Sequence, residues 1–270
     1  MEAIRYTRIK YNNAEYYAEI EGDTAYILDK SYFDGGKRTG ESVTESEALA
    51  LTPVENNKIV CIGKNYADHA KEMGSEIPEE PLMFLKPNTC LLPHNGKIII
   101  PKISERVDYE AELAVVIGKT AKDINEEEYK DYIFGYTCAN DVTARDLQAR
   151  DGQWTRGKGF DTFLPLGPYI IKDINPESLD IKLYLNNELK QSSNTKSFIF
   201  DIKTILKAVT DVMTLYPGDV ILTGTPEGIG QMKNGDIVRV EIAGVGTLSN
   251  EVLGASPQTP QKGHVPFESQ

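Results

Sequence analysis

In the stretch from Asp108 to Gly118, Glu110 and Glu112 place two carboxylates inside a segment that is otherwise apolar after Asp108. Its Val- and Ile-rich end is typical of a β-strand, and the alternation of side chains along a strand puts Glu110 and Glu112 on one face. Both faces become apolar further along, so the carboxylates lie at the entry of a buried strand. Two like charges about 7 Å apart in a low-dielectric interior are costly unless something neutralises them. A hard divalent cation would do so; the alternative is a strand end that lies in solvent.

A third carboxylate follows a second apolar stretch. Residues 133–139 predict a strand that runs directly into Asn140 and Asp141, and functional groups often emerge where a strand ends. Asp141 could instead cap a helix over residues 142–149. If the three carboxylates meet, an oxygen-only site without His or Cys suits Mg²⁺, Mn²⁺ or Ca²⁺ better than zinc or copper.

Length and charge limit the class of protein. The 270 residues carry a formal net charge of −12, and 40% of them are hydrophobic, as in ordinary soluble proteins. The acidic balance argues against a nucleic-acid or anionic-lipid surface, because such surfaces need a basic footprint. No stretch has the ~18 apolar residues of a membrane span, and residues 1–13 lack the apolar core of a signal peptide. Three widely spaced cysteines predict no disulfide framework, which favours the cytoplasm.

Strand candidates recur along the chain, whereas helical stretches are few. Strands are predicted at 82–86, 97–100, 110–117, 133–139, 167–172, 180–186, 219–223 and 236–242, and helices near 126–132 and 201–214. This pattern favours an α+β, strand-dominated fold over a doubly wound sheet. We expect a small N-terminal domain at residues 1–55 with a β-hairpin around 21–24, a catalytic domain at 56–254, and a C-terminal tail at 255–270.

A histidine and a glutamate could form a water-activating pair. His69 and Glu72 stand three residues apart, so on a helical turn they share a face and Glu72 could orient the imidazole. An oriented histidine can act as a general base. A surface ion pair is the alternative interpretation.

Two further segments could bind an anion. Lys158 is flanked by two glycines, where unobstructed backbone lets a ligand approach closely; it could equally be a solvated loop lysine. The apolar strand and Gly/Pro loop at 221–230 could offer backbone N–H groups and the Thr225 hydroxyl to an anion, or form a structural turn. The loop matches neither a Walker phosphate loop nor a Rossmann loop.

Six blocks in this order resemble the fumarylacetoacetate hydrolase family. They are GKNYADHAKEM, MFLKP, DYEAELAVVIG, GYTCANDVTARDLQ, QWTRGKGFDTFLPLGP and LTGTPEGIG, and they span residues 63–230. The resemblance implies a mixed β-sandwich roll as the catalytic domain, with a small N-terminal α/β domain. It also implies a homodimer that binds Mg²⁺ or Mn²⁺ and a small keto-acid or diketo-acid substrate.

Carried over position by position, the resemblance gives each candidate residue a role. The implied metal ligands are Glu110, Glu112 and Asp141. The implied catalytic residues are His69 and Glu72, on a lid that orders on binding, and Lys158, which would stabilise developing negative charge. The implied substrate contacts are Arg145, Gln148, Thr225 and Lys86.

The predicted reaction is hydrolysis of a C–C bond in a 1,3-diketo acid such as an acylpyruvate or fumarylacetoacetate. We hypothesise that the acid chelates the ion, which acts as a Lewis acid and stabilises the enolate that forms as the bond breaks. Decarboxylation of an oxaloacetate-type keto acid and isomerisation of a dienoate pass through the same enolate, so both stay open as alternatives. A non-catalytic binding module is the alternative from another class.

Overall fold

The computed structural model describes residues 4–55 and 57–254. The apolar segment that carries the two carboxylates forms strand β11 (Ala111–Ile117), in which every residue is buried. β11 pairs antiparallel with β12 (Ile133–Asn140) on one side and with β17 (Val220–Leu222) on the other. A strand that is paired on both sides and covered on both faces has a continuous apolar sequence, which explains why these strands could be predicted.

These three strands belong to a twelve-stranded sheet. Its other members are β1 (Arg5–Tyr11), β2 (Ala14–Glu21), β3 (Thr24–Leu28), β4 (Arg38–Thr44), β5 (Leu49–Ala50), β6 (Ile59–Gly63), β7 (Leu82–Lys86), β8 (Leu91–Leu92) and β14 (Leu164–Ile171). The order is β4-β3-β2-β1-β14-β12-β11-β17-β6-β7, with β5 beside β1 and β8 beside β14. Most pairs are antiparallel, but β17 and β6 run parallel, as do β14 and β8.

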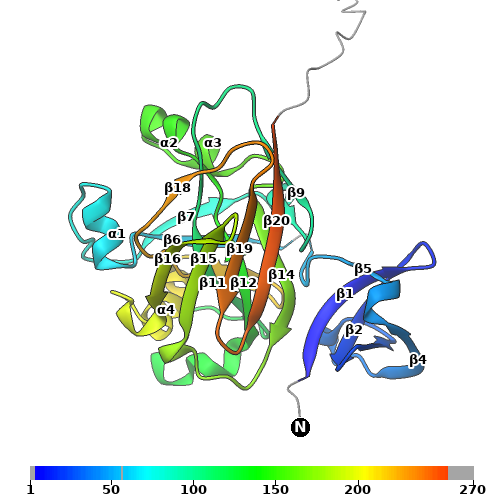
Figure 1. The fold of residues 1–270 in the computed structure, drawn as a ribbon. Helices are drawn as coiled ribbons and strands as arrows, with labels where there is room; N and C mark the ends of the chain where they lie inside the picture. The colour runs from blue at the N-terminus through cyan, green and yellow to red at the C-terminus, as the bar shows by residue number, and fades with distance from the viewer. Residues whose placement is uncertain (1–3, 56, 255–270) are drawn as a thin grey trace, which may run out of the picture.

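A five-stranded sheet covers the middle of the large one. It consists of β16 (Glu188–Asn194), β15 (Asp180–Leu185), β19 (Ile237–Ile242), β20 (Gly246–Gly254) and β9 (Lys97–Ile100), in that order. Its strands contact β11, β12 and β14 and lie across them (Figure 1). A small third sheet joins β13 (Thr143–Ala144), β10 (Val107–Tyr109) and β18 (Gly230–Gln231). The α+β, strand-dominated prediction is confirmed.

The helices are short and lie outside the sheets. They are α1 (Ala67–Glu72), α2 (Arg145–Asp151), α3 (Thr155–Lys158) and α4 (Ile202–Val212). α1 projects from one side of the molecule, and α2 and α3 lie together above β7 (Figure 1). The side chain of Asp201 caps α4 by accepting a hydrogen bond from the Thr204 N–H at 2.8 Å. The helix predicted near 126–132 is a 3-10 helix, η4 (Glu126–Tyr132).

The first unit is built from β1 to β5. The prediction of an α/β domain here was wrong in its helical part, because the helical turns in residues 4–55 are the short 3-10 segments η1 (Tyr32–Asp34) and η2 (Glu45–Glu47). Tight turns favour strands instead: Asn12 and Asn13, with φ of 49° and 63°, form a two-residue hairpin turn between β1 and β2. β1 also pairs with β14, so the unit extends the large sheet. The predicted tail at 255–270 lies outside the described residues.

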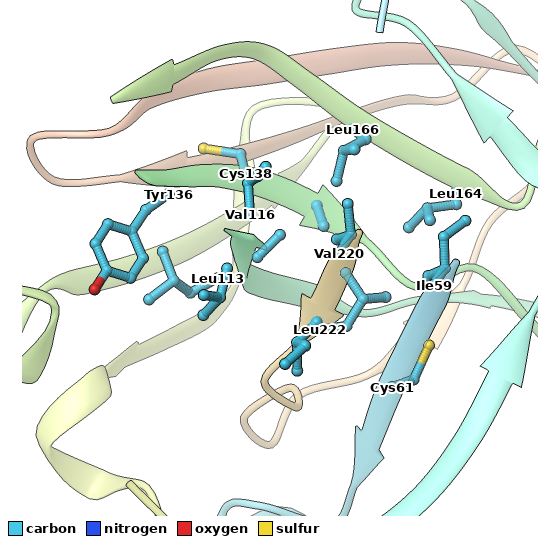
Figure 2. Close-up of a cluster of buried hydrophobic side chains, with 14 of the residues drawn as sticks. Ile59, Cys61, Leu113, Val116, Tyr136, Cys138, Leu164, Leu166, Val220 and Leu222 are labelled. Atoms are coloured by element: carbon cyan, nitrogen blue, oxygen red, sulfur yellow. The ribbon is translucent and has the colours of Figure 1, made fainter. Parts of the chain in front are cut away.

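One large hydrophobic core fills the space between the sheets. Figure 2 shows part of it, with Ile59 and Cys61 of β6 near Val220 and Leu222 of β17. Cys61, Cys90 and Cys138 are all buried and free, which confirms that they form no disulfide. Among the described residues, none of the helices has the length and apolar character needed to cross a membrane.

Candidate metal centre and active site

The three carboxylates predicted from two separate segments lie together at one end of β11 and β12. Glu110 precedes β11, Glu112 is its second residue, and Asp141 directly follows β12. They offer ligand oxygens that all lie within 4.8 Å of one another. The three residues are 3%, 2% and 1% exposed, so a strand end in solvent is excluded.

Hydrogen bonds between the strand ends hold this arrangement. The Asp141 N–H donates to the Glu110 carbonyl oxygen at 2.9 Å, and the Glu110 N–H donates to the Asn140 side-chain oxygen at 2.9 Å. The alternative of a helix cap fails, because α2 begins at Arg145 and its N-cap residue is Ala144. Asp141 is therefore fixed by the sheet and not by a helix.

Three cations surround the cluster, and each comes from a different element. Lys158 of α3 donates to Glu110 Oε2 and to Asp141 Oδ2, both at 2.7 Å. Lys86 of β7 donates to Asp141 Oδ1 at 2.6 Å. Arg145 of α2 bonds to Glu110. Two of the three carboxylates thus have direct ion-pair partners.

Glu112 is the carboxylate without a cation partner in the described part of the chain. Its carboxylate accepts a hydrogen bond from the Gly224 N–H at 2.6 Å. Burial raises the pKa of Glu112 well above its ordinary value, and the nearby charges of Asp141 and Glu110 raise it further. Burial also acts to raise the pKa of Glu110, but Lys158 and Arg145 outweigh it and leave that pKa lowered. A positive charge beside Glu112 is what the cluster lacks.

The donor set fits a hard divalent ion. Three buried carboxylates without a His or Cys ligand match the oxygen coordination of Mg²⁺ and Mn²⁺, and Ca²⁺ accepts the same ligand type. An ion held by Glu110, Glu112 and Asp141 would also supply the charge that Glu112 lacks. Both the ligand types and the charges of the cluster therefore fit a bound divalent metal ion.

His69 and Glu72 form a hydrogen-bonded pair on α1. His69 Nδ1 lies 3.1 Å from Glu72 Oε2, and the other Glu72 oxygen accepts from the Gly228 N–H at 3.1 Å. A carboxylate at Nδ1 favours the tautomer that is protonated there, which leaves Nε2 free to accept a proton. His69 is 5% exposed, whereas the Glu72 side chain is 32% exposed, so the pair joins a buried imidazole to a carboxylate that solvent reaches.

One cavity of about 270 Å³ is lined by both His69 and the three carboxylates. It is lined by Ile62, Gly63, Lys64, His69, Met73, Phe84, Glu110, Glu112, Asp141, Arg145, Gln148, Ala149, Trp154, Lys158 and Thr225. Eight of the ten predicted site residues line it, and Glu72 joins them through its hydrogen bond to His69. Lys86 is not among the lining residues; its Nζ is held by Asp141 and, at 3.2 Å, by the Val142 carbonyl oxygen.

Sequence reasoning missed several residues that orient this site. Gln191 of β16 is buried, accepts from the Ala111 N–H at 2.9 Å and donates to Thr225 Oγ1 at 2.9 Å and to the Pro226 carbonyl oxygen at 2.8 Å. Asp108 holds Arg145 Nε at 3.0 Å. Both residues contact partners that are distant in the chain, so no local spacing in the sequence could predict their roles.

Comparisons with known proteins agree with the blocks found in the sequence. The family model described as fumarylacetoacetate (FAA) hydrolase C-terminal matches residues 58–253, and a model described as Rv2993c-like, N-terminal matches residues 4–53. Among curated relatives is a protein of Xenopus laevis named oxaloacetate tautomerase fahd2, mitochondrial. It is 42% identical over 245 residues, which cover 86% of this chain and 76% of the relative.

Solved structures have the same fold. The 2-hydroxyhepta-2,4-diene-1,7-dioate isomerase from Mycobacterium marinum is 40% identical, with a TM-score of 0.88 over 94% of this chain and 100% of that one. The fumarylpyruvate hydrolase from Pseudomonas aeruginosa, in complex with Mn²⁺ and pyruvate, is 33% identical, with a TM-score of 0.71 over 76% of this chain and 91% of that one. With the family model spanning most of its length, the chain belongs to the fumarylacetoacetate hydrolase family.

Proposed function

We propose that the protein is a divalent-metal-dependent hydrolase that cleaves a C–C bond in a 1,3-diketo acid of the acylpyruvate or fumarylpyruvate type. The observation that carries the proposal is the single cavity lined by the three buried carboxylates and by His69, whose imidazole is hydrogen-bonded to Glu72. A structural neighbour that is a fumarylpyruvate hydrolase with Mn²⁺ and pyruvate supports the same chemistry.

Glu110, Glu112 and Asp141 would hold Mg²⁺ or Mn²⁺. When bound, such an ion supplies Lewis-acid polarisation of a keto oxygen. As formal charges, the three carboxylates are balanced by Lys86, Lys158 and Arg145, and Asp108, which also contacts Arg145, is balanced by Arg106. A divalent ion would therefore leave two positive charges in the site. This excess favours an anionic keto acid and the negative charge that develops as the C–C bond breaks.

The cavity also presents hydrogen-bond donors in fixed orientations. Gln191 donates to Thr225 Oγ1, so the hydroxyl hydrogen of Thr225 is left to donate to a substrate oxygen. Gln148 Oε1 accepts from Arg145 at 2.7 Å, which leaves the amide N–H groups of Gln148 for the substrate. The Thr225 hydroxyl and the Gln148 amide can therefore donate hydrogen bonds to a carboxylate or a keto oxygen of the substrate.

His69 would take a proton from water for the hydrolytic step. Glu72 holds the Nδ1 proton and so keeps Nε2 as the accepting atom. The water oxygen would attack the carbonyl carbon of the bond that breaks, and the proton on Nε2 would then be available to the departing enolate. General base catalysis of this kind contributes about 10²- to 10⁴-fold to a rate.

The test is an assay of fumarylpyruvate and an acylpyruvate with Mg²⁺ or Mn²⁺. We expect pyruvate release that stops after chelation and returns when Mn²⁺ is added. His69→Ala should lower hydrolysis by about 10²- to 10⁴-fold while Mn²⁺ binding, followed by calorimetry, stays nearly unchanged. His94→Gln, which changes a histidine outside the cavity, is the matched control and should keep full activity. Full activity in chelator-treated protein would refute the metal-dependent function.

A second candidate is enolate chemistry without hydrolysis, and two relatives favour it. One is named an oxaloacetate tautomerase and another a dienoate isomerase. We infer that a tautomerase, an isomerase or an oxaloacetate-type decarboxylase would need the carboxylate cluster but no attack by water. Turnover of oxaloacetate that survives the His69→Ala substitution, with no pyruvate from fumarylpyruvate, would support this candidate over the hydrolase. Separate measurement of CO₂ release distinguishes decarboxylation from tautomerisation.

A further inference from the structure

We propose that Lys64 is a specificity-determining residue that binds a second carboxylate of the substrate. The inference rests on the proposed function, because it concerns the same cavity and the same class of acid. It goes further by assigning a residue that tells a dicarboxylate from a monocarboxylate of equal length.

Lys64 differs from the other cations of the cavity. Lys158 and Arg145 are both joined to carboxylates, Lys158 at 2.7 Å from Glu110 and Arg145 at 3.0 Å from Asp108. Lys64 lines the same cavity, but within residues 4–55 and 57–254 no hydrogen bond or ion pair engages its ammonium group. Its positive charge is therefore available to a ligand, whereas the charges of the other two are already paired.

The backbone of Lys64 is held in a conformation that lysine does not favour. Its φ is 59°, in the left-handed region, where a side chain is typically destabilising by about 1–2 kcal/mol. Such strain persists only where the neighbours over-determine it, and it is concentrated at functional sites. A glycine would relieve the strain at this position, and a long cationic side chain in its place fits a use of the ammonium group in binding a ligand.

Both neighbours of Lys64 are fixed. A Cβ on Gly63 would lie 2.7 Å from a ring carbon of Trp154, so the indole packs directly on this glycine. Asn65 is fully buried; its amide donates to the Phe200 carbonyl oxygen at 3.0 Å, and its side-chain oxygen accepts from the Phe200 N–H at 2.7 Å. The backbone on either side of Lys64 is thereby anchored, and the residue is held at the cavity wall.

The positive charges of the cavity can balance one more negative charge on the substrate. With a divalent ion, the cluster and its cations carry two excess positive charges, which the carboxylate of a keto acid and the charge developing on its enolate would offset. Lys64 adds a third positive charge to the cavity lining. A second carboxylate on the substrate is the group of matching charge, and a charge-assisted hydrogen bond to an ammonium is stronger than a neutral one.

The experiment compares two ligands that differ in one charge. They are fumarylpyruvate and its methyl ester at the fumaryl carboxylate, assayed with Mn²⁺. Lys64→Met keeps an unbranched side chain that is one atom shorter and removes the charge, and we expect kcat/KM for fumarylpyruvate to fall about 10- to 100-fold, mainly through KM. The ester should be turned over equally by both proteins, and Lys64→Arg should restore most of the activity on the diacid. Lys71→Met, at an exposed position of α1 outside the cavity lining, is the matched control and should behave as wild type.

Three outcomes decide the matter. An equal loss on both ligands, or no loss on either, would overturn the assignment of Lys64. If wild type hydrolyses neither ligand, the proposed function fails, and binding of the two ligands measured by calorimetry still tests Lys64. In that case a preference for the diacid that is present in wild type and lost in Lys64→Met supports the assignment, and its absence from wild type overturns it.

Discussion

The three carboxylates of the candidate metal centre have different partners in the metal-free protein. Substitutions of Asp141 and Glu112 should therefore have different effects on its stability. Asp141 is bonded to Lys86 at 2.6 Å and to Lys158 at 2.7 Å. Within the described residues, the Glu112 carboxylate has a single hydrogen bond, from the Gly224 N–H. We predict that Asp141→Asn destabilises the metal-free fold strongly and that Glu112→Gln does not.

The magnitude follows from what each change leaves behind. In Asp141→Asn, Lys158 keeps Glu110 as an ion-pair partner, but Lys86, whose side chain is 0% exposed, loses its counter-charge and keeps neutral oxygen acceptors such as the Val142 carbonyl. One uncompensated buried charge typically costs about 3–5 kcal/mol. In Glu112→Gln the amide oxygen can still accept from Gly224, and a negative charge that two other carboxylates oppose is removed. The free energy of unfolding of Glu112→Gln should therefore stay within about 1 kcal/mol of the wild-type value.

Urea unfolding with a chelator, and again with Mn²⁺, measures both effects. An ion at 100 times its dissociation constant stabilises the native state by about 2.7 kcal/mol, and both variants should lose this gain. Asp211→Asn, which breaks a half-exposed pair with Lys207 on α4, is the control and should change the free energy of unfolding by less than about 1 kcal/mol. Equal destabilisation by the two site variants without metal would refute the charge argument. Full Mn²⁺ stabilisation of Glu112→Gln would refute its role as a ligand.

Two further predictions concern groups outside the carboxylate cluster. Gln191→Leu leaves the buried Ala111 N–H without an acceptor and should lower the free energy of unfolding by about 1–3 kcal/mol; an unchanged urea midpoint would contradict this. Burial lowers the pKa of His94, whose Nδ1 accepts from the Ser249 N–H at 3.0 Å. Because the unfolded chain then binds the proton first, the stability that neutral His94 contributes is present above pH of about 6.5 and is lost as pH falls through the folded pKa. His94→Gln should therefore reduce the loss of stability between pH 7.5 and 5.5, and an unaltered acid limb in urea titrations would refute it.

The parts of the fold that could be predicted are those buried on both faces. β11 and β12 have continuous apolar sequences because no solvent reaches either side of them. β4 was not predicted, since six of its seven residues are exposed and its sequence is polar. η4 was predicted as a helix from a seven-residue pattern, which does not distinguish an α-helix from a 3-10 helix at that length, and the segment forms a 3-10 helix.

In the candidate site, too, some features could be predicted from the local sequence and others could not. The period of a strand put Glu110 and Glu112 on one face, and helical spacing paired His69 with Glu72, so local geometry was enough. The partners of these residues were beyond local reasoning. Gln191 meets Ala111 across 80 positions of the chain, and such contacts depend on how the two sheets pack.

The short pairing between β1 and β14 has a consequence for how the protein can be divided. Arg5 and Tyr6 lie opposite Ile171 and Ile170, so the first unit occupies backbone groups that would otherwise open to water. A catalytic region expressed without the first unit would present an apolar strand edge, and such edges template pairing with other chains. Self-association of a truncated protein would then result from the exposed edge of β14. It would reveal nothing about the oligomeric state of the intact chain.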